Sequence, residues 1–164
     1  MKEDPFLLEA KNLRVIRGGT LLLDIPSLKI QGGESLALIG PNGAGKTTLM
    51  HALSYLLQPF EGEVWFKREK VQSRDSILAY RRKLAMVFQE PLLFDTTVFK
   101  NIASGLKIRG MKQSAIDEIV GQQLEIFGIG HLRDRSARTL SGGEAQRTTL
   151  ARALAVSPEI MFLD

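Results

Sequence analysis

Apolar and polar side chains alternate through the first thirty residues, which is the pattern of half-buried strands. Residues 7–15 and 21–30 carry the alternation, and the residues between them include Gly18 and Gly19. Two such runs around a short glycine-containing loop at residues 17–20 predict a β-hairpin. Residues 63–66 predict another strand.

Three later runs are short and almost wholly apolar. They cover residues 35–39, 84–88 and 160–163. Apolar runs of this length are typical of strands buried on both faces of a parallel sheet. The sequence therefore predicts three central strands that lie far apart along the chain.

Helical spacing fills much of the remaining sequence. Four leucines recur on one face after Lys46, before a proline that should end the helix: Leu49, Leu53, Leu56 and Leu57, then Pro59. Residues 77–83 also predict a helix. Residues 91–156 predict a helical region broken at residue 110, at residues 128–130 and at residues 141–143. Strands alternating with helices predict an α/β sheet with an inserted helical region.

Composition narrows the class of protein. The 164 residues include no Cys, which excludes a disulfide scaffold, a thiolate zinc site and a Cys nucleophile. No apolar run approaches the roughly 18–20 residues of a membrane span, and the N-terminus lacks the pattern of a signal peptide. We therefore expect that the chain does not cross a membrane by itself. The net charge is +4, but acids interrupt the basic groups, so we expect solvated faces and no nucleic-acid partner.

One segment carries the chemistry of a phosphate site. It follows the first central strand and fits the pattern G-x-x-x-x-G-K-[ST] with Gly40, Pro41, Asn42, Gly43, Ala44, Gly45, Lys46 and Thr47. Glycines let successive backbone N–H groups point at phosphate oxygens, and the following helix adds its positive dipole end. Lys46 can reach the β- and γ-phosphates, and the Thr47 hydroxyl can ligate Mg²⁺. The pattern predicts a nucleoside triphosphate site without telling ATP from GTP.

A second glycine-rich segment opens a later helix. It reads Leu140, Ser141, Gly142, Gly143, Glu144, followed by Gln146 and Arg147. Ser141 is a good N-cap, and the exposed N–H groups of such a helix start can hold an anion. Taken alone, the segment favours a capped helix over an anion site.

Together these segments resemble the motifs of ATP-binding cassette (ABC) ATPases along essentially the whole chain. The first glycine-rich loop resembles the Walker A motif, Gln89 the Q-loop glutamine, residues 140–144 the signature, and residues 160–164 the Walker B strand with Asp164. Their order and spacing also agree. The implied fold is a P-loop NTPase (RecA-like) core at residues 1–89 and 158–164. A helical subdomain at residues 90–157 is inserted into it, and the chain would lack the C-terminal part of the core.

The resemblance also implies roles and cofactors. ATP and Mg²⁺ would be bound, with Lys46 and Thr48 on the phosphates and Thr47, Gln89 and Asp164 around the metal. Ser141, Gly142, Gly143 and Glu144 would meet the γ-phosphate held by a second cassette in a head-to-tail dimer. The family's adenine-stacking aromatic position falls on Arg17, which leaves the base contact open between a stacked and a solvated Arg17.

Two features of the family are expected to lie outside these residues. Its catalytic Glu follows the Walker B aspartate, and its switch His comes later still. His51 and His131 precede the signature, so we expect both to be surface or packing residues. Residues 1–164 alone are therefore expected to bind nucleotide and to hydrolyse it negligibly. The family's central strand that leads to the switch His would be missing too, so unpaired strand edges should make these residues poorly soluble or partly molten.

Residues 86–110 resemble importers that use binding proteins, and within these the oxyanion (tungstate/molybdate) group. The resemblance implies membrane permease subunits and a substrate-binding protein as partners, and a cytoplasmic location on the inner face of the membrane. A soluble ABC-type ATPase acting on ribosomes or DNA remains an alternative. The apolar residues after Gln89 could form a groove for a partner helix or belong to the core: Leu92, Leu93, Phe94, Val98 and Phe99.

Overall fold

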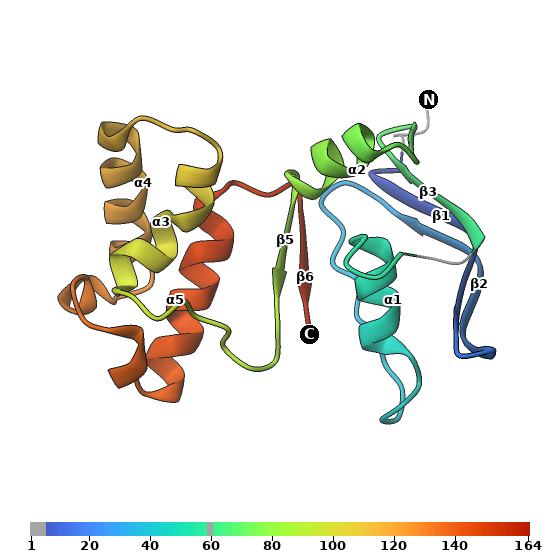
Figure 1. Cartoon of the computed structure of the whole chain (residues 1–164), viewed down its shortest axis with the longest axis horizontal. Helices are drawn as coiled ribbons and strands as arrows, with labels where there is room; N and C mark the ends of the chain where they lie inside the picture. Colours follow the sequence, from blue (N-terminus) through green and yellow to red (C-terminus); the bar gives the residue numbers. More distant parts are fainter. Residues whose placement is uncertain (1–5, 59–60) are drawn as a thin grey trace. The chain divides into compact units, whose positions relative to one another are not determined.

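A computed structural model describes residues 6–58 and 61–164 of the chain (Figure 1). The chain forms two compact units, of which the first ends at Arg82 and the second runs from Lys83 to Asp164. Each unit has its own sheet and helices, so each is described by itself.

The first unit is built on an antiparallel four-stranded sheet in the order β2-β1-β3-β4. The strands are β1 (Leu8–Arg17), β2 (Thr20–Ile30), β3 (Glu61–Phe66) and β4 (Glu69–Val71). Strands β1 and β2 form the predicted hairpin, with Leu8 opposite Ile30. Strand β4 was not predicted, because three residues are too few to show an alternation.

The apolar alternation in β1 changes phase at Asn12. Leu8 and Ala10 are buried before it and Leu13 and Val15 after it. Asn12 has a φ of 48°, and the register of β1 against β3 shifts between Lys11 and Arg14. A β-bulge here re-aims the strand so that both halves face the core. Gly62 lies against the bulge, where a Cβ atom would overlap the carbonyl of Asn12.

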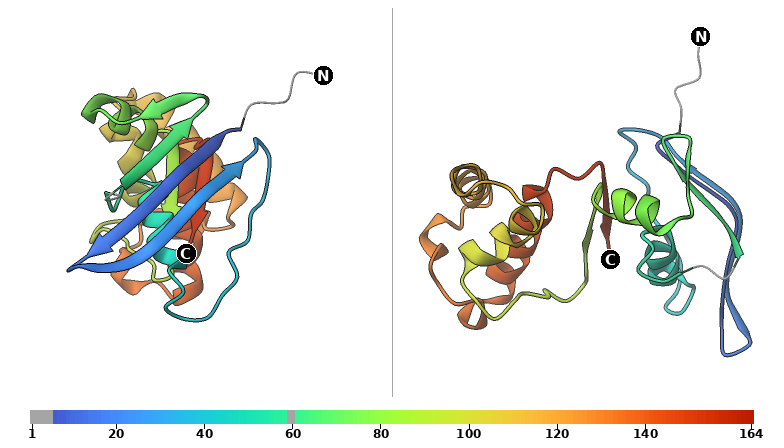
Figure 2. Two further views of the ribbon diagram at one scale, coloured as in Figure 1. Left: turned by 90° about the vertical axis from the view of Figure 1, so that its right-hand side faces the viewer. Right: turned by 45° about the horizontal axis from the view of Figure 1, so that its top comes forward.

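Helices α1 (Lys46–Leu53) and α2 (Arg74–Arg81) lie on one face of this sheet (Figure 2). The buried side of α1 consists of Leu49, Met50, Ala52 and Leu53. The hydroxyl of Tyr80, in α2, donates to the Leu53 carbonyl at 2.8 Å, and burial raises the pKa of Tyr80. The end of α1 is therefore tied to α2 by a buried hydrogen bond.

The prediction that the first helix extends towards Pro59 is wrong. Helix α1 ends at Leu53, and Tyr55 follows in a left-handed conformation with a φ of 55°. A residue in this conformation just past the C-cap ends a helix as glycine usually does. Leu56, predicted on the buried face, is 46% exposed. Pro59 lies outside the described residues.

The strand predicted at residues 35–39 is also wrong. These residues form no strand, and Ile39 is 95% exposed. A strand buried on both faces needs hydrogen-bonded neighbours on both sides, and none of the described strands pairs with this segment. The glycine-rich loop therefore follows a mostly exposed segment without regular secondary structure.

The second unit combines two parallel strands with three helices. Strands β5 (Leu84–Val87) and β6 (Ile160–Leu163) pair in register, with Leu84 opposite Ile160, which confirms both predicted strands. The helices are α3 (Val98–Ile108), α4 (Gln113–Ile126) and α5 (Gly142–Ala155), with short 3₁₀ turns at Gly130–Leu132 and Ala137–Thr139. The predicted breaks at residue 110 and residues 128–130 fall between the α-helices, whereas α5 begins within the break predicted at residues 141–143.

The helices of this unit enclose one apolar core. Its buried members include Ile102 and Leu106 of α3, Val120 of α4 and Ala151 of α5. On its other side α5 packs Ala153 against Ala85 and Val87 of β5, which fixes the signature helix to the small sheet. None of the described helices is both long and apolar enough to span a bilayer.

Candidate functional site

The glycine-rich loop of the first unit curls back on itself before α1. Gly43 and Gly45 have φ values of 81° and 85°, in the left-handed region that favours glycine. The Lys46 ammonium lies over the loop and donates to the carbonyls of Gly40 at 2.8 Å and Pro41 at 2.7 Å. The two turns therefore bring the cation to the mouth of its own loop.

The start of α1 suits an anion. Its N-cap residue is Gly45, no side chain caps the helix, and its first turn contains no acidic residue. The first N–H groups of a helix have no intrahelical acceptor, and together with the dipole and Lys46 they favour a phosphate. A Cβ atom at Gly45 would lie 3.4 Å from the Leu22 carbonyl. The residues present therefore fit a nucleotide's phosphates.

The second unit places two candidate residues at one edge of its sheet. Gln89 follows β5 and Asp164 follows β6, and the Asp164 N–H donates to the Val87 carbonyl at 3.0 Å. Because the strands are parallel, their carboxyl ends meet at the same edge. Both residues are exposed. An exposed carboxylate and amide supply the oxygen ligands that Mg²⁺ prefers.

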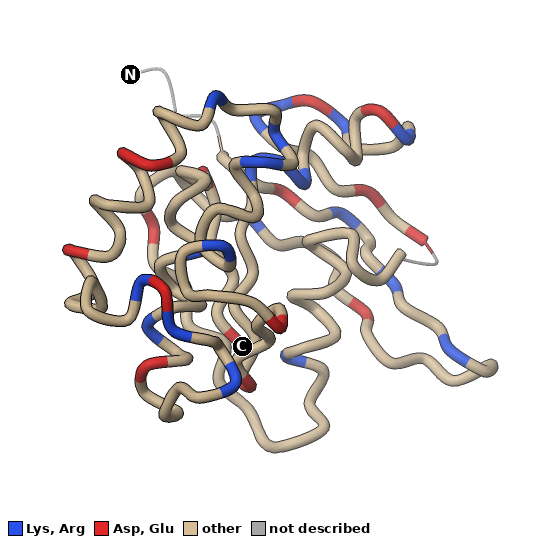
Figure 3. Tube along the Cα trace, turned by 60° about the vertical axis from the view of Figure 1, so that its left-hand side comes forward, with Lys and Arg blue, Asp and Glu red and all other residues tan. Residues whose placement is uncertain are grey.

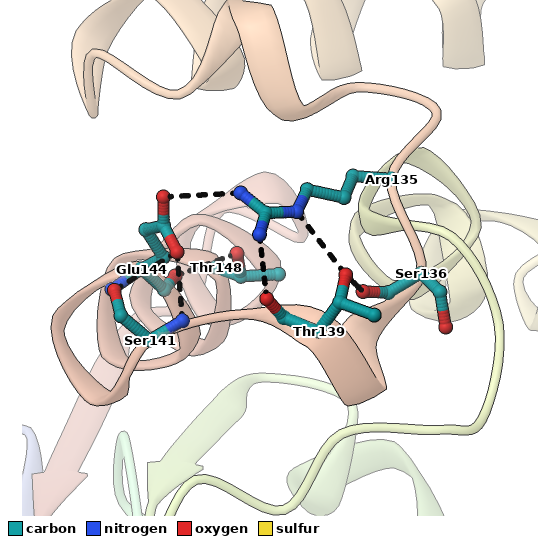
Figure 4. A network of polar contacts seen from close by, with 6 residues as sticks. All are labelled: Arg135, Ser136, Thr139, Ser141, Glu144 and Thr148. Atoms are coloured by element: carbon teal, nitrogen blue, oxygen red, sulfur yellow. Dashed lines mark hydrogen bonds and ion pairs between the residues drawn. The ribbon is translucent and has the colours of Figure 1, made fainter.

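The signature segment is a self-capped helix start (Figure 4). The Ser141 N–H and hydroxyl donate to one carboxylate oxygen of Glu144 at 2.7 and 2.9 Å, and the Glu144 N–H donates to the Ser141 hydroxyl. This reciprocal pair is a capping box. Gly142 and Gly143 form the first two helical positions, and a Cβ atom at Gly142 would meet nothing within 4 Å. The outer side of the helix start is thus open.

The Glu144 carboxylate is stabilised in its charged form. Hydrogen bonds from Ser141 are the largest cause that lowers the pKa of Glu144, and the charge of Arg135 adds to them. Arg135 lies 3.6 Å from the carboxylate. The signature therefore holds the negative charge of Glu144 in place with donors from Ser141 and the guanidinium of Arg135.

The segment that follows Gln89 is held by a buried asparagine. The Asn101 amide donates to the carbonyls of Phe94 and Thr97 at 3.0 Å and accepts from the Phe94 N–H at 2.8 Å. The apolar residues of this segment were expected either to form a groove for a partner helix or to belong to the core, and they divide between the two. Val98 is buried in the helical core, whereas Leu92 and Phe94 are more than half exposed.

The remaining candidates lie apart from these motifs. Arg17 is exposed at the tip of the β1–β2 hairpin, opposite Thr20. His51 is half-buried on α1, and His131 is exposed in the first 3₁₀ turn. No group of three or more His, Asp or Glu side chains among the described residues could hold a metal by itself.

Sequence reasoning missed two residues that organise the second unit. Asn101 gives no periodic signal, since a single buried amide in a helix looks like any surface asparagine. Arg135 joins Glu144 and Thr139, and only the folded loop brings these side chains together. Nothing in the local sequence marks either residue.

Comparison with known proteins identifies the family. The model of the ABC transporter family matches residues 23–164. The chain is 41% identical over 153 residues to a tungstate uptake system ATP-binding protein of Peptoclostridium acidaminophilum, covering 93% of this chain and 69% of the relative. It is 40% identical over 157 residues to a phosphate import ATP-binding protein of Natronomonas pharaonis, covering 89% of this chain and 55% of the relative.

A solved structure shares the fold. The structure of cbiO1 from Clostridium perfringens, part of the ABC transporter complex cbiONQ, superposes with a TM-score of 0.86 at 30% identity, covering 97% of this chain and 65% of that one. The chain belongs to the ABC transporter family, and the predicted α/β ABC ATPase fold is confirmed. It spans about half to two thirds of the length of these relatives.

Proposed function

We propose that the whole protein is the ATP-binding subunit of a membrane importer and hydrolyses ATP to drive transport. The observation that carries this proposal is the glycine-rich loop, where Lys46 lies over a cap-free helix start in a chain of the ABC transporter family. The names of its relatives, which are import or uptake proteins, support the transport role.

Within this function the loop residues bind and position the phosphates of ATP. Backbone N–H groups from Asn42 to Thr48 would surround the phosphates, and the Lys46 ammonium would exchange its loop carbonyls for phosphate oxygens. Thr47 and Asp164 would supply oxygen ligands to Mg²⁺, with Gln89 beside the metal and the attacking water. Phosphoryl transfer depends mainly on such positioning and charge stabilisation, so these side chains orient the nucleotide more than they react with it.

Further parts of the proposal concern assembly. Two cassettes would meet head to tail, so that Ser141, Gly142 and Gly143 of one approach the γ-phosphate held by the other. Permease subunits would dock near the exposed Leu92 and Phe94, which would place the protein on the inner face of the membrane. A substrate-binding protein would deliver the solute. Such a division of labour leaves the choice of solute to other subunits.

The finer proposal is an oxyanion as the transported solute. It rests on two relatives whose names specify tungstate and phosphate, together with the residues after Gln89. Radiolabelled uptake with tungstate, molybdate, phosphate and sulfate in competition tests it. Uptake of an uncharged or cationic solute, with no competition from any oxyanion, would contradict it.

The decisive experiment on the proposed function is replacement of Lys46. We expect Lys46→Ala in the whole protein to weaken ATP binding about tenfold to a hundredfold, because a charge-assisted contact of about 1.5–3 kcal/mol is lost. Lys100→Ala removes an exposed lysine of α3 and serves as the matched control. Isothermal calorimetry and phosphate release measure both variants. ATP binding and turnover that survive Lys46→Ala would overturn the proposal.

A second measurement concerns residues 1–164 alone. We expect these residues to bind nucleotide with negligible turnover, because the family's catalytic Glu lies outside them. Robust turnover that Lys46→Ala abolishes would show that a base within these residues suffices.

A further inference from the structure

A carboxylate lies at the helix start that the proposed function assigns to a phosphate. Glu144 belongs to the first turn of α5, and its side chain is about one fifth exposed. Like charges repel, and a helix N-terminus offsets only part of one anion. If a γ-phosphate approaches Ser141, the charge of Glu144 must be compensated by a neighbouring cation.

Arg135 is placed to supply that cation. Its guanidinium lies 3.6 Å from Glu144 Oε1 and donates to the Thr139 carbonyl at 2.8 Å and the Thr139 hydroxyl at 3.1 Å (Figure 4). Three contacts to two residues fix the planar group in one orientation. The same side chain thus joins the loop before the signature to the signature helix itself.

The backbone of Arg135 is held from the other side. Its carbonyl accepts from the Val98 N–H at 3.0 Å, and the Ala137 N–H donates to the Thr96 carbonyl at 2.9 Å. These bonds tie Arg135 to the segment that leads from Gln89 into α3. A displacement of that segment would therefore be passed to the guanidinium and on to Glu144.

The neighbouring arginines have other partners. Arg133 stacks over the ring of Phe99 at 4.2 Å, and Arg138 forms an exposed ion pair with Asp95. His131 also contributes to the lowered pKa of Glu144, after Arg135. Figure 3 shows that basic and acidic residues intermingle over this unit. Arg135 is thus the arginine of this loop that contacts the signature.

We propose that Arg135 is a positioning residue for the signature: it compensates the charge of Glu144 and holds the Ser141–Glu144 capping box in the geometry that receives the phosphate of a second cassette. The proposal rests on the proposed function. It goes beyond it by assigning a role to a residue outside the motifs and by linking the segment after Gln89 to the signature through one guanidinium.

The test is a double-mutant cycle in the whole protein assembled with its transporter. The variants are Arg135→Ala, Glu144→Gln and their combination, with Arg135→Lys as the conservative change and Arg138→Ala as the control. We expect Arg135→Ala to lower the ATPase rate about fivefold, the upper range for a partly exposed ion pair. Arg135→Lys keeps the charge but loses the fork to Thr139, so we expect an intermediate rate.

The combination separates charge compensation from a merely structural role. In the Glu144→Gln background, Arg135→Ala should cost less than about twofold, because no uncompensated carboxylate remains and the two changes are coupled. A structural role through Thr139 would cost the same in both backgrounds. Equal losses in both backgrounds, an unchanged rate in Arg135→Ala, or an equal loss in Arg138→Ala would each overturn the proposal.

A binding measurement separates this proposal from the function on which it rests. ATP affinity of single cassettes, at protein concentrations too low for them to associate, should be unchanged in Arg135→Ala and strongly reduced in Lys46→Ala. If Lys46→Ala changes nothing, the proposed function fails. If Lys46→Ala abolishes turnover while the cycle shows no coupling, only the role of Arg135 fails. Unchanged hydrogen exchange in the buried turns of α5, which belongs to the same unit as Arg135, should show that the Arg135→Ala protein is folded.

Discussion

Two helices of this protein begin at glycine-rich segments, and the two beginnings are built in opposite ways. Helix α1 begins at Gly45, with no side-chain cap and no acid in its first turn. Helix α5 begins at Ser141, with a complete capping box and Glu144 in its first turn. The first therefore leaves its N–H groups and dipole free to bind a ligand. In the second, the side chains of Ser141 and Glu144 already accept hydrogen bonds from some of the N–H groups at the helix start.

The difference matches the source of stability of each helix. Helix α1 has only eight residues, a length that is marginal in isolation, so its conformation depends on packing against the sheet. Helix α5 has fourteen residues and a capping box, so its first turn contributes to its own stability. A helix start without a cap depends on the packing of its helix for a fixed conformation. A capped helix start is held by its own hydrogen bonds, so its remaining N–H groups keep a fixed orientation.

The largest effect should come from removing the packing beneath α1. Leu53 is 2% exposed, and Leu53→Ala should cost about 2–5 kcal/mol of stability and release the helix that carries Lys46. Leu56→Ala is the matched control, since Leu56 is 46% exposed. Urea unfolding and hydrogen exchange of residues 46–53 measure both. Equal losses in the two variants would contradict the buried role of Leu53.

The glycines at the two helix starts should respond differently to alanine. Gly45 has a φ of 85°, where a side chain costs about 1–2 kcal/mol, so Gly45→Ala should weaken ATP binding about five- to thirtyfold. Gly142 has helical backbone and open space around a Cβ atom. Gly142→Ala should stabilise α5 by about 0.5–1 kcal/mol and leave ATP binding to the separate cassette unchanged. Calorimetry and thermal unfolding check the pair, and reversed effects would refute the comparison.

Removing the cap of α5 should have a smaller, local effect. Ser141→Ala loses the acceptor for the Glu144 N–H, which costs about 1 kcal/mol. The matched control is Ser73→Ala, since Ser73 and Ser76 form the capping box of α2 in the first unit. Hydrogen exchange should accelerate in the first turn of α5 for one variant and of α2 for the other. Acceleration spread through both helices in either variant would argue against two separate units.

The elements that local patterns define were predicted from the sequence. The hairpin, strands β5 and β6 and the breaks between the helices of the second unit depend on alternation, apolar runs and glycines, and the structure confirms them. Residues 35–39 failed because a buried strand depends on neighbours that a local pattern does not show. The end of α1 failed because Tyr55 adopts a left-handed conformation that a tyrosine rarely signals.

In the candidate site, too, local patterns were predicted and contacts between distant residues were not. The loop before Lys46 and the signature were found because each is a contiguous motif. The contacts that organise them were not, since Asn101 and Arg135 act across folded loops. The roles of Gln89, Asp164 and Arg17 are predictions from the family resemblance. The structure places Gln89 and Asp164 after the carboxyl ends of β5 and β6 and Arg17 at the tip of a hairpin.

The smallest expected effect is a pH dependence of stability at the start of α5 that the start of α1 should lack. The pKa of Glu144 is lowered by the hydrogen bonds from Ser141, so the ionised carboxylate stabilises the fold above the ordinary carboxyl pKa of about 4.3, and this contribution is lost as the pH falls through the lowered value. The difference in unfolding free energy between wild type and Glu144→Gln should therefore be largest near neutral pH and shrink in acid.

In Ser141→Ala the pH-dependent part of the unfolding free energy should diminish but persist, because the backbone N–H of residue 141 is the larger cause of the lowered pKa. The first turn of α1 contains no acid, so hydrogen exchange there should not follow this titration. Urea titrations from pH 3 to 7 test the prediction, and a difference that stays constant across that range would show that the Glu144 carboxylate contributes nothing through its charge.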